Sequence, residues 1–374
     1  MLRDYEDVAE YLLRRGWIDD EIVVAGELEL TDRSRRNANF EVRTHPDRGY
    51  FLKQETRRAG ELAFGSVGYE AAVYELLTTL RRGALTSSCL PIWHAFDPVE
   101  QVLVLEALVG WVTLTEHYLR RRRSSATIAA RLAEALADLH ELTTDERERM
   151  EGALGSPDQP PWVFFLTEPN HSLLLSSSSA SIELVRILQQ SEQLVGAFEL
   201  LRRQWRNTAF VHGDVKWDNC LVPATAASHR ESQIKIVDWE MARIGDPCWD
   251  AGAVFGGHLA AWLASIPVSA NDAPDLFLEL ARFPLARMQP ALRTFWRVYC
   301  KRLKLPPVDA GDWLVRAVSF AGVRLVQTAF EQLQGETELT PSAVLLVQLC
   351  SNIVERPVEA AVQLLGIPLP EQGA

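Results

Sequence analysis

Two short apolar runs that each end in an acidic turn most constrain how this chain can fold. The run Ala209–Val211 leads into the turn His212–Asp214, and the run Ile234–Val237 leads into Asp238. Short apolar runs bounded by polar residues are typical of short β-strands. The pattern therefore predicts two carboxylates at the ends of strands, within a region of short strands and loops over residues 208–240.

Asp214, Asn219 and Asp238 carry side chains that suit phosphoryl transfer. A carboxylate in a turn, such as Asp214, can accept the proton of a substrate hydroxyl. Asn219 follows five residues later and can offer its amide oxygen to a metal, while Asp238 can bridge a metal to phosphates. Oxygen ligands of this kind suit Mg²⁺, and no His/Cys cluster suggests zinc. Phosphoryl transfer needs a positioned acceptor and neutralised phosphates, which these side chains can provide.

The wider pattern resembles the aminoglycoside phosphotransferase and choline kinase family. Three segments match that family in order and spacing: HGDVKWDN at 212–219, IKIVDWE at 234–240 and GDPCWD at 245–250. The resemblance covers residues 20–335, and its specific part lies at 212–250. It implies an α+β, two-lobed protein-kinase-like fold and an ATP-dependent kinase that uses Mg²⁺.

By the same resemblance, Lys53 and Glu70 form an ion pair that serves ATP. Lys53 follows the strand-like run Tyr50–Leu52 and would contact the α- and β-phosphates. Glu70 opens a predicted helix seventeen residues later, with Glu61 and Glu75 as rival partners for the lysine. The alternative is that Lys53 and Glu70 are ordinary surface charges.

The resemblance also implies where adenine binds. The segment from residue 103 to 110 (LVLEALVG) resembles the family's hinge, in which backbone groups near Glu106 and Leu108 would pair with the adenine edge. Side-chain identity matters little to such contacts, so position in the chain carries this prediction.

The expected phosphate loop departs from the glycine-rich pattern. The segment Ser34–Phe40 resembles the family's serine-x-x-asparagine turn, with Ser34 and Asn37 as the matching residues, but it lacks the preceding glycines. Glycine normally lets backbone N–H groups approach phosphates closely. Arg35 or Arg36 either contacts phosphate instead or faces solvent, and ATP rather than GTP is an expectation from the family alone.

Other residues near the acidic turns have predicted roles in supporting or extending the site. Lys216 stands where protein kinases place a lysine on the transferred phosphoryl group, and we expect the same role here; the alternative is an exposed loop lysine. The resemblance implies that His212 supports the loop by hydrogen bonding and that Asp250 braces it. His140 is expected to pack in the core beneath the loop.

The coarse pattern predicts a small antiparallel-sheet N-lobe with one helix, followed by a large, mainly helical C-lobe. We expect residues 1–108 to form the nucleotide-binding lobe and 109–374 the catalytic and substrate-binding lobe. The predicted helices of the first part cover residues 4–15 and 67–82. Its predicted strands are Ile22–Ala25, Phe40–Val42, Tyr50–Lys53, Leu90–Ala95 and Gln101–Glu106. A loop is expected over 152–181, and helices over 182–205, 275–304 and 310–334.

Composition and net charge restrict the kinds of binding partner and the cellular compartment that we expect for this protein. The formal net charge of −12 argues against nucleic-acid binding, which needs a basic face. The five cysteines are scattered and never form a C-x-x-C pair, so we expect reduced thiols in a cytoplasmic protein. No signal peptide and no apolar stretch of membrane-spanning length are apparent, so no membrane association is expected. The sequence does not indicate an oligomeric state.

Three functions remain open from the sequence. The first is transfer of the γ-phosphoryl group of ATP to a hydroxyl of a small molecule, such as an aminoglycoside, an amino alcohol or a sugar. The second is phosphorylation of Ser or Thr in a peptide, such as a natural-product precursor, which the kinase-like Lys216 favours. The third, a non-catalytic binding module, is disfavoured because Lys53, Asp214, Asn219 and Asp238 are all present.

Overall fold

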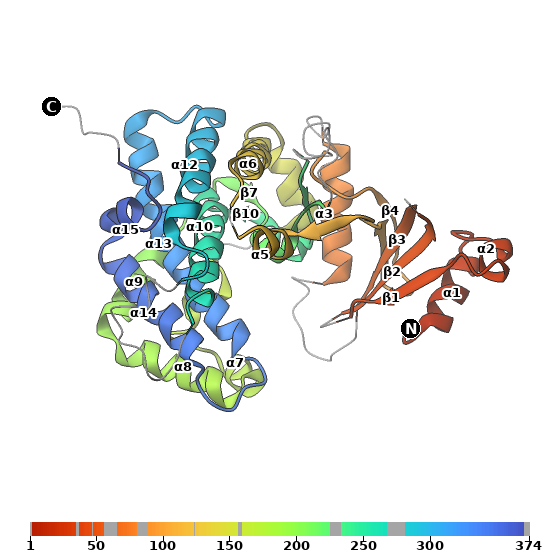
Figure 1. The fold of residues 1–374 in the computed structure, drawn as a ribbon, viewed down its shortest axis with the longest axis horizontal. Coiled ribbons are helices and arrows are strands. Elements are labelled where there is room, and N and C mark those ends of the chain that lie inside the picture. The colour runs from red at the N-terminus through yellow and green to blue at the C-terminus, as the bar shows by residue number, and fades with distance from the viewer. Residues whose placement is uncertain are drawn as a thin grey trace. The chain divides into compact units, whose positions relative to one another are not determined.

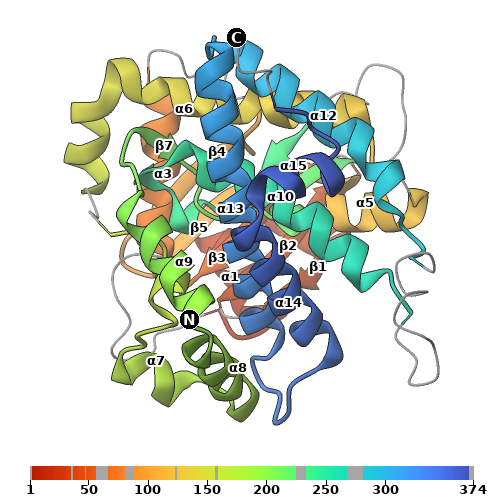
Figure 2. The ribbon, with the colours of Figure 1, turned by 90° about the vertical axis from the view of Figure 1, so that its left-hand side faces the viewer.

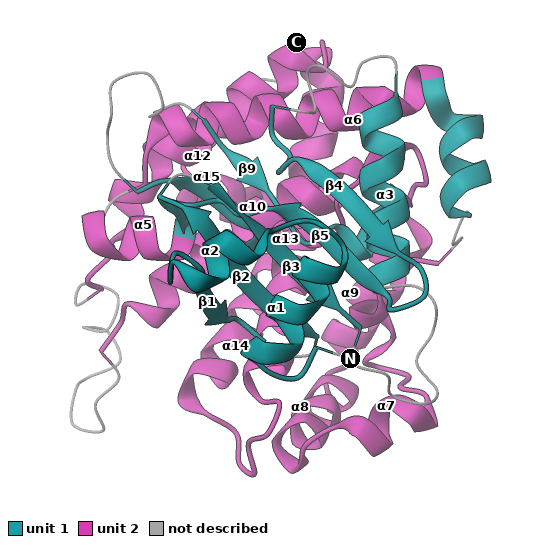
Figure 3. Cartoon of the chain, turned by 90° about the vertical axis from the view of Figure 1, so that its right-hand side faces the viewer, with its two compact units in different colours: residues 1–114, 146–155, 218–242 teal, residues 115–145, 156–217, 243–374 magenta. Residues whose placement is uncertain are grey.

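The computed structural model describes residues 2–34, 37–46, 48–55, 66–80, 88–122, 124–155, 159–224, 233–267 and 281–369. The chain forms two compact units (Figure 3). Unit 1 comprises residues 1–114, 146–155 and 218–242, and unit 2 comprises 115–145, 156–217 and 243–374. Within the described residues, no helix combines the length and the apolar character needed to cross a membrane.

Unit 1 is built on an antiparallel sheet of five strands in the order β1-β2-β3-β5-β4, as predicted for the first part of an α+β fold (Figure 1). The strands are β1 (Glu29–Asp32), β2 (Ala38–His45), β3 (Arg48–Gln54), β4 (Trp93–Asp97) and β5 (Val102–Glu106). The helices of this part are α1 (Tyr5–Arg14), α2 (Asp20–Val24) and α3 (Val67–Thr79). A smaller sheet has the order β6-β8-β9 and contains β6 (Trp111–Thr113), β8 (Cys220–Pro223) and β9 (Lys235–Ile236).

The two faces of the large sheet pack against different helices. Leu52 of β3 joins Phe40, Val42 and other apolar side chains in a core that packs against α1 (Figure 3). Successive side chains of a strand point to opposite faces, so Lys53 points away from this core. On that second face α3 packs against β4 and β5 and brings Glu70 with it. The alternation of side chains along β3 therefore places Lys53 on the face of the sheet that α3 covers.

The predicted strand at Ile22–Ala25 is wrong, because Ile22–Val24 lie in helix α2 and Ala25 is the C-cap of that helix. The side chain of Asp19 accepts a hydrogen bond from the backbone N–H of Ile22 and caps the helix. The first strand is instead β1, in a segment that is mostly polar. Its single apolar side chain, Leu30, lies opposite Val42 of β2.

Unit 2 is mainly helical, as predicted. Its helices are α5 (Leu114–Arg121), α7 (His171–Ser176), α8 (Ser179–Gln190), α9 (Glu192–Arg203), α10 (Pro247–Ala264), α12 (Leu285–Arg302), α13 (Pro307–Gln332), α14 (Pro341–Glu355) and α15 (Pro357–Gln363). Helix α6 (Ala126–Leu154) belongs to unit 2 up to residue 145 and to unit 1 from residue 146. Two strands, β7 (Ala209–Val211) and β10 (Arg243–Gly245), pair antiparallel.

The predicted loop over 152–181 is wrong in part. It contains a 3-10 helix, η1 (Trp162–Phe165), and helix α7, whose first turn is capped by the side chain of Asn170. The Pro- and Ser-rich composition suggested a loop, but asparagine and serine also begin helices. Residues 156–158 and 275–280, which formed parts of the predicted elements, lie outside the described residues.

Close packing of α10 against α13 fixes the centre of unit 2 (Figure 2). A Cβ atom on Gly252 would lie 2.7 Å from the backbone oxygen of Ala317, and one on Gly256 would lie 3.1 Å from Cβ of Arg324. These two glycines are one helical turn apart, so they let the backbones approach along a shared line. The same approach places Arg324 beside the residues that follow β7.

Candidate functional site

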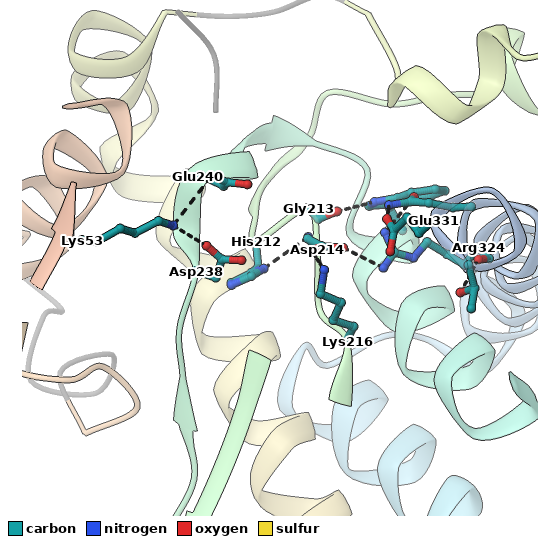
Figure 4. Close-up of polar contacts among 12 residues, drawn as sticks. Lys53, His212, Gly213, Asp214, Lys216, Asp238, Glu240, Arg324 and Glu331 are labelled. Atoms are coloured by element: carbon teal, nitrogen blue, oxygen red, sulfur yellow. Dashed lines mark hydrogen bonds and ion pairs between the residues drawn. The ribbon is translucent and has the colours of Figure 1, made fainter. Parts of the chain in front are cut away.

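In unit 1, three carboxylates surround one buried lysine. The ammonium of Lys53 lies 2.6 Å from Oε2 of Glu70, 2.6 Å from Oδ1 of Asp238 and 3.7 Å from Oε2 of Glu240. Figure 4 shows Lys53 pointing toward Asp238 and Glu240. The predicted partner Glu70 is therefore in contact with Lys53, and the alternative that both are surface charges is wrong, since both side chains are buried.

Several elements hold this cluster together. Ser66 caps α3 by accepting a hydrogen bond from the N–H of Tyr69, and the Tyr69 hydroxyl donates to the backbone oxygen of Ala242 at 2.5 Å. The backbone N–H of Trp239 donates to Oε1 of Glu70 at 3.2 Å. Glu70 thus contacts both Lys53 and the residue after Asp238, which ties α3 to the end of the β8–β9 pair.

The charge balance keeps Lys53 protonated. Burial alone would lower the pKa of Lys53, but the carboxylates of Glu70, Asp238 and Glu240 outweigh it and raise that pKa above its usual range. The four side chains together carry more negative than positive charge. A cluster with this excess of carboxylates favours a further cation.

Asp238 has an unusual backbone. Its φ of 68° and ψ of 62° lie in the left-handed region, which costs a non-glycine residue about 1–2 kcal/mol. Strained positions of this kind are concentrated at functional sites. The side chain is 32% exposed, so its carboxylate reaches solvent while Lys53 stays buried. These properties support the predicted role of Asp238 as a metal ligand.

The second predicted metal ligand lies beside the first. In the β8–β9 pair Cys220 is opposite Ile236, and the backbone N–H of Val237 donates to the oxygen of Asn219 at 3.0 Å. Asn219 and Asp238 therefore stand at the same end of this ladder. In the described residues no group of three or more His, Cys, Asp or Glu side chains is arranged to hold a metal ion. Mg²⁺ is commonly bound by one or two protein oxygens together with substrate phosphates, a pattern that this pair fits.

The residues predicted to hold adenine and phosphate are placed as follows. Glu106 ends β5, and its side chain accepts a hydrogen bond from the N–H of Ile92 at 3.0 Å. The backbone oxygen of Leu108 accepts from the N–H of Trp111 at 3.1 Å. Ser34 is exposed, and its hydroxyl accepts from the N–H of Asn39 at 3.0 Å, whereas Asn37 is buried. Arg35 and Arg36 lie outside the described residues.

In unit 2, the loop after β7 presents Asp214. The N–H of Asp214 donates to Nδ1 of His212 at 3.2 Å, which confirms that His212 supports the loop by hydrogen bonding. Asp250 accepts from the backbone N–H of His212 at 2.8 Å and of Gly213 at 3.0 Å, so its predicted bracing role is also confirmed. His140 contacts Asp250 at 3.1 Å from beneath the loop and is buried, as expected.

Two cations contact the carboxylate of Asp214. Nη2 of Arg324 lies 2.8 Å from Oδ1, and Nζ of Lys216 lies 2.9 Å from Oδ2 (Figure 4). Burial alone would raise the pKa of Asp214, but Arg324 and then Lys216 lower that pKa well below its usual range. Asp214 is therefore an ionised carboxylate at neutral pH.

The sequence interpretation missed Arg324 and gave Glu240 no role. Glu240 belongs to the IKIVDWE segment, so its position two residues after Asp238 could have drawn attention to it. Arg324 lies 110 residues after Asp214 in the chain. The available signal was one charge within an apolar helical stretch, SFAGVRLVQTAF at 319–330, since buried charges in helices usually have partners.

A curated relative matches part of the chain. Mouse acyl-CoA dehydrogenase family member 10 is 24% identical over 142 residues, which is 38% of this chain and 12% of that protein. The chain thus spans only a small part of that relative's length.

Solved structures with a similar arrangement cover most of the chain. Amicoumacin kinase hAmiN, solved with AMP-PNP, Ca²⁺ and Ami, has a TM-score of 0.50 and 14% identity, covering 92% of this chain and 95% of that one. A choline/ethanolamine kinase family protein from Mesorhizobium loti has a TM-score of 0.49 and 16% identity, covering 88% and 89%. At 14% identity, the similarity to amicoumacin kinase shows the fold alone.

The family follows from the sequence match. Residues 29–290, well over half of the chain, match the phosphotransferase enzyme family. This range contains Lys53, Glu70, the loop with Asp214 and the segment with Asp238. The chain belongs to the phosphotransferase enzyme family.

Proposed function

We propose that this enzyme transfers the γ-phosphoryl group of ATP to a hydroxyl of a small molecule. The observation that carries the proposal is the Lys53 cluster, in which one lysine contacts Glu70 and Asp238 at 2.6 Å each. A lysine held by a helix glutamate beside a metal-binding aspartate is what the tail phosphates of ATP require. The amicoumacin kinase of similar fold was solved with an ATP analogue and Ca²⁺, which agrees with this assignment.

The chain's own residues have distinct tasks in the proposed reaction. Lys53 binds the α- and β-phosphates and Glu70 orients it. Asn219 and Asp238 would hold Mg²⁺, which when bound neutralises charge on the phosphates. The backbone near Glu106 and Leu108, and the turn with Ser34 and Asn37, remain proposals for adenine and phosphate contacts.

Asp214 is the proposed base. The acceptor oxygen forms a bond to the γ-phosphorus as the bond from that phosphorus to the bridging oxygen of ADP breaks. The acceptor's proton passes to the carboxylate of Asp214. Lys216 would contact the transferred phosphoryl group once ATP is bound.

The division of labour along the chain is also a proposal. Residues 1–108 would bind the nucleotide, and 109–374 would supply the base and the acceptor site. We also propose that the enzyme acts in the cytoplasm, where ATP is available.

The test is a transfer assay with γ-labelled ATP and Mg²⁺. The acceptor panel would contain aminoglycosides, amino alcohols, sugars, macrolides and Ser/Thr peptides, and Asp214→Asn would be the control. We expect label on a small molecule, with a rate at least about a hundredfold lower in the Asp214→Asn protein. Label on peptides alone would favour the peptide kinase. Equal rates for both proteins, or ATP binding without any turnover, would rule out the proposed mechanism.

A further inference from the structure

The two cations on Asp214 are held differently. The side chain of Arg324 is 8% exposed, whereas that of Lys216 is 39% exposed. Lysine is a point charge on a flexible four-carbon stem, and arginine has a planar fork that can bond two partners at once. Lys216 can therefore leave Oδ2 of Asp214 at little cost, while Arg324 is set to stay on Oδ1.

Arg324 is fixed from two further sides. Its Nη1 donates to Oε1 of Gln327 at 2.9 Å, and its guanidinium lies 5.2 Å from the ring centroid of Trp249. Trp249 is itself bonded to the loop, because its Nε1 donates to the backbone oxygen of Gly213 at 2.8 Å. The guanidinium of Arg324 thus lies between Gln327 and Trp249, and Trp249 is bonded to the residue that precedes Asp214.

Gln327 is also fixed in orientation. Its oxygen accepts from Arg324, and its Nε2 donates to Oε1 of Glu331 at 2.8 Å. Turning the amide over would set donor against donor at Arg324 and acceptor against acceptor at Glu331. The three side chains occupy positions i, i+3 and i+7 of α13 and form a hydrogen-bonded row from buried Arg324 to exposed Glu331.

We propose that Arg324 is a positioning residue for the base, one that holds Asp214 through Oδ1 so that Oδ2 takes the proton of the acceptor hydroxyl. Lys216 is the cation that moves from Oδ2 when ATP and acceptor bind. The hydrogen-bonded row Arg324–Gln327–Glu331 keeps the guanidinium of Arg324, and with it the carboxylate of Asp214, in a fixed position. A fixed position matters because displacing a catalytic base by a fraction of an ångström lowers the reaction rate. This inference rests on the proposed function.

A second buried arginine of α13 provides a matched comparison. Nε of Arg316 lies 3.2 Å from Oδ2 of Asp246, the residue that caps α10. Arg316 and Arg324 share a helix, are both buried and each pair with an aspartate. Only Arg324 touches Asp214, so the two arginines separate an effect on the base from a general loss of packing.

Charged and titratable groups face Asp214 from its own loop and from two helices of unit 2. They are His212 and Lys216 on the loop and Arg324 on α13, with Asp250 behind the loop from α10. Removing Arg324 takes away the first of the two cations that depress the pKa of Asp214. The titration of Asp214 therefore reports on the contact with Arg324 without any reference to turnover.

The experiment compares wild type with Arg324→Met, Arg324→Lys, Gln327→Met, Arg316→Met and Asp214→Asn. Turnover is followed as Mg²⁺-dependent phosphate release from ATP with water as the acceptor, giving kcat and the KM for ATP. The carboxyl carbon of Asp214 is titrated by ¹³C NMR in aspartate-labelled protein, with its signal assigned by loss in Asp214→Asn. Thermal unfolding is measured for every variant.

We expect Arg324→Met to lower kcat about tenfold or more with little change in the KM for ATP. The titration of Asp214 should move upward by about 1–3 pH units in this variant. Arg324→Lys should recover part of kcat because it restores the charge, and Gln327→Met should lower kcat about threefold by loosening the guanidinium. Arg316→Met should lower Tm but leave both kcat and the Asp214 titration near wild type.

Each contrary outcome is distinguishable. Wild-type kcat and an unmoved titration in folded Arg324→Met would overturn the inference, as would equal losses of kcat in Arg316→Met and Arg324→Met. If Arg324→Met does not fold, wild-type kcat in both Arg324→Lys and Gln327→Met would overturn it. Equal turnover of wild type and Asp214→Asn would instead defeat the proposed function, and the NMR titration would still test the contact.

Discussion

The carboxylate of Asp250 holds the backbone of Gly213 in place. Oδ1 of Asp250 accepts the N–H of Gly213 at 3.0 Å, and Oδ2 accepts the N–H of His212 at 2.8 Å. Gly213 has a φ of 81°, in the left-handed region that glycine adopts without strain. Because Asp214 follows directly, the position of the proposed base depends on a buried carboxylate that is itself remote in sequence.

We predict that Asp250→Asn destabilises the protein and slows phosphoryl transfer. An asparagine side chain keeps one accepting oxygen and turns the other position into a donor, which leaves a buried backbone N–H unpaired. The expected loss is about 1–3 kcal/mol in the free energy of unfolding, measured by urea denaturation. The kcat should fall with it, because the turn that carries Asp214 loses an anchor.

Asp312→Asn is the control for this substitution. Asp312 is exposed on α13, so removing its charge should change the unfolding free energy little. Equal stability of Asp250→Asn and Asp312→Asn would show that the two hydrogen bonds to Asp250 contribute nothing.

Lys53 is predicted to serve both stability and ATP binding, and two variants can separate these roles. Lys53→Met leaves the buried carboxylate of Glu70 without its cation, which should cost about 3–5 kcal/mol of unfolding free energy. Lys53→Met combined with Glu70→Gln removes the buried charge as well, so stability should largely return. The KM for ATP should stay raised in both proteins, because neither has the cation for the phosphates.

The measurements are the free energy of unfolding, from urea denaturation, and steady-state kinetics for Lys53→Met, for Glu70→Gln alone as a reference and for the double variant. A double variant as unstable as Lys53→Met would mean that the ion pair is not the source of the loss. A normal KM for ATP in any protein without Lys53 would remove this lysine from the proposed phosphate site.

Much of the sheet and of the Lys53 cluster could be predicted from local patterns. Phe40–Val42 alternates apolar and polar side chains as strands do, whereas Tyr50–Leu52 is a short apolar run that ends at Lys53. Both segments lie within the strands found. The Ile22–Ala25 prediction failed because four residues carry no period that separates strand from helix, so the cap at Asp19 decided the structure.

The partners of Asp214 show where local reasoning stops. Lys216 is two residues away and is visible in the loop's own sequence. Arg324 reaches Asp214 because Gly252 and Gly256 let α13 approach α10, a relationship between segments some seventy residues apart. Spacing within one segment carries no information on such packing, so only the folded structure identifies Asp214 as the partner of this arginine.

The left-handed backbone of Asp238 leads to a further prediction. Asp238→Gly and Asp238→Ala both lack the carboxylate, so both should lose Mg²⁺-dependent turnover. They differ in strain, because glycine adopts a φ of 68° freely and alanine does not. We expect Asp238→Gly to be more stable than Asp238→Ala by about 1 kcal/mol. Urea denaturation measures this difference, and equal stability would mean that the strain is released elsewhere.

His258 is predicted to make the protein less stable in weak acid. Its side chain is buried on α10 against Trp217, with ring centroids 4.9 Å apart, and burial lowers the pKa of His258 to about 4. The unfolded chain, in which histidine titrates near 6.5, then binds the proton more readily than the folded protein. Stability from the neutral ring is therefore complete above about pH 6.5 and is lost as the pH falls toward 4.

The size of the stability loss due to His258 follows from the difference between its folded and unfolded pKa values, and a substitution at this position isolates it. Each pKa unit is worth about 1.4 kcal/mol, so His258 should account for about 3 kcal/mol of the stability lost between pH 7 and pH 4. In His258→Phe, which keeps an aromatic ring against Trp217, urea denaturation should show a pH dependence weaker by that amount. Exposed His171 on α7 is the control, and His171→Gln should follow wild type. Parallel curves for wild type and His258→Phe would show that the imidazole at 258 does not titrate differently on folding.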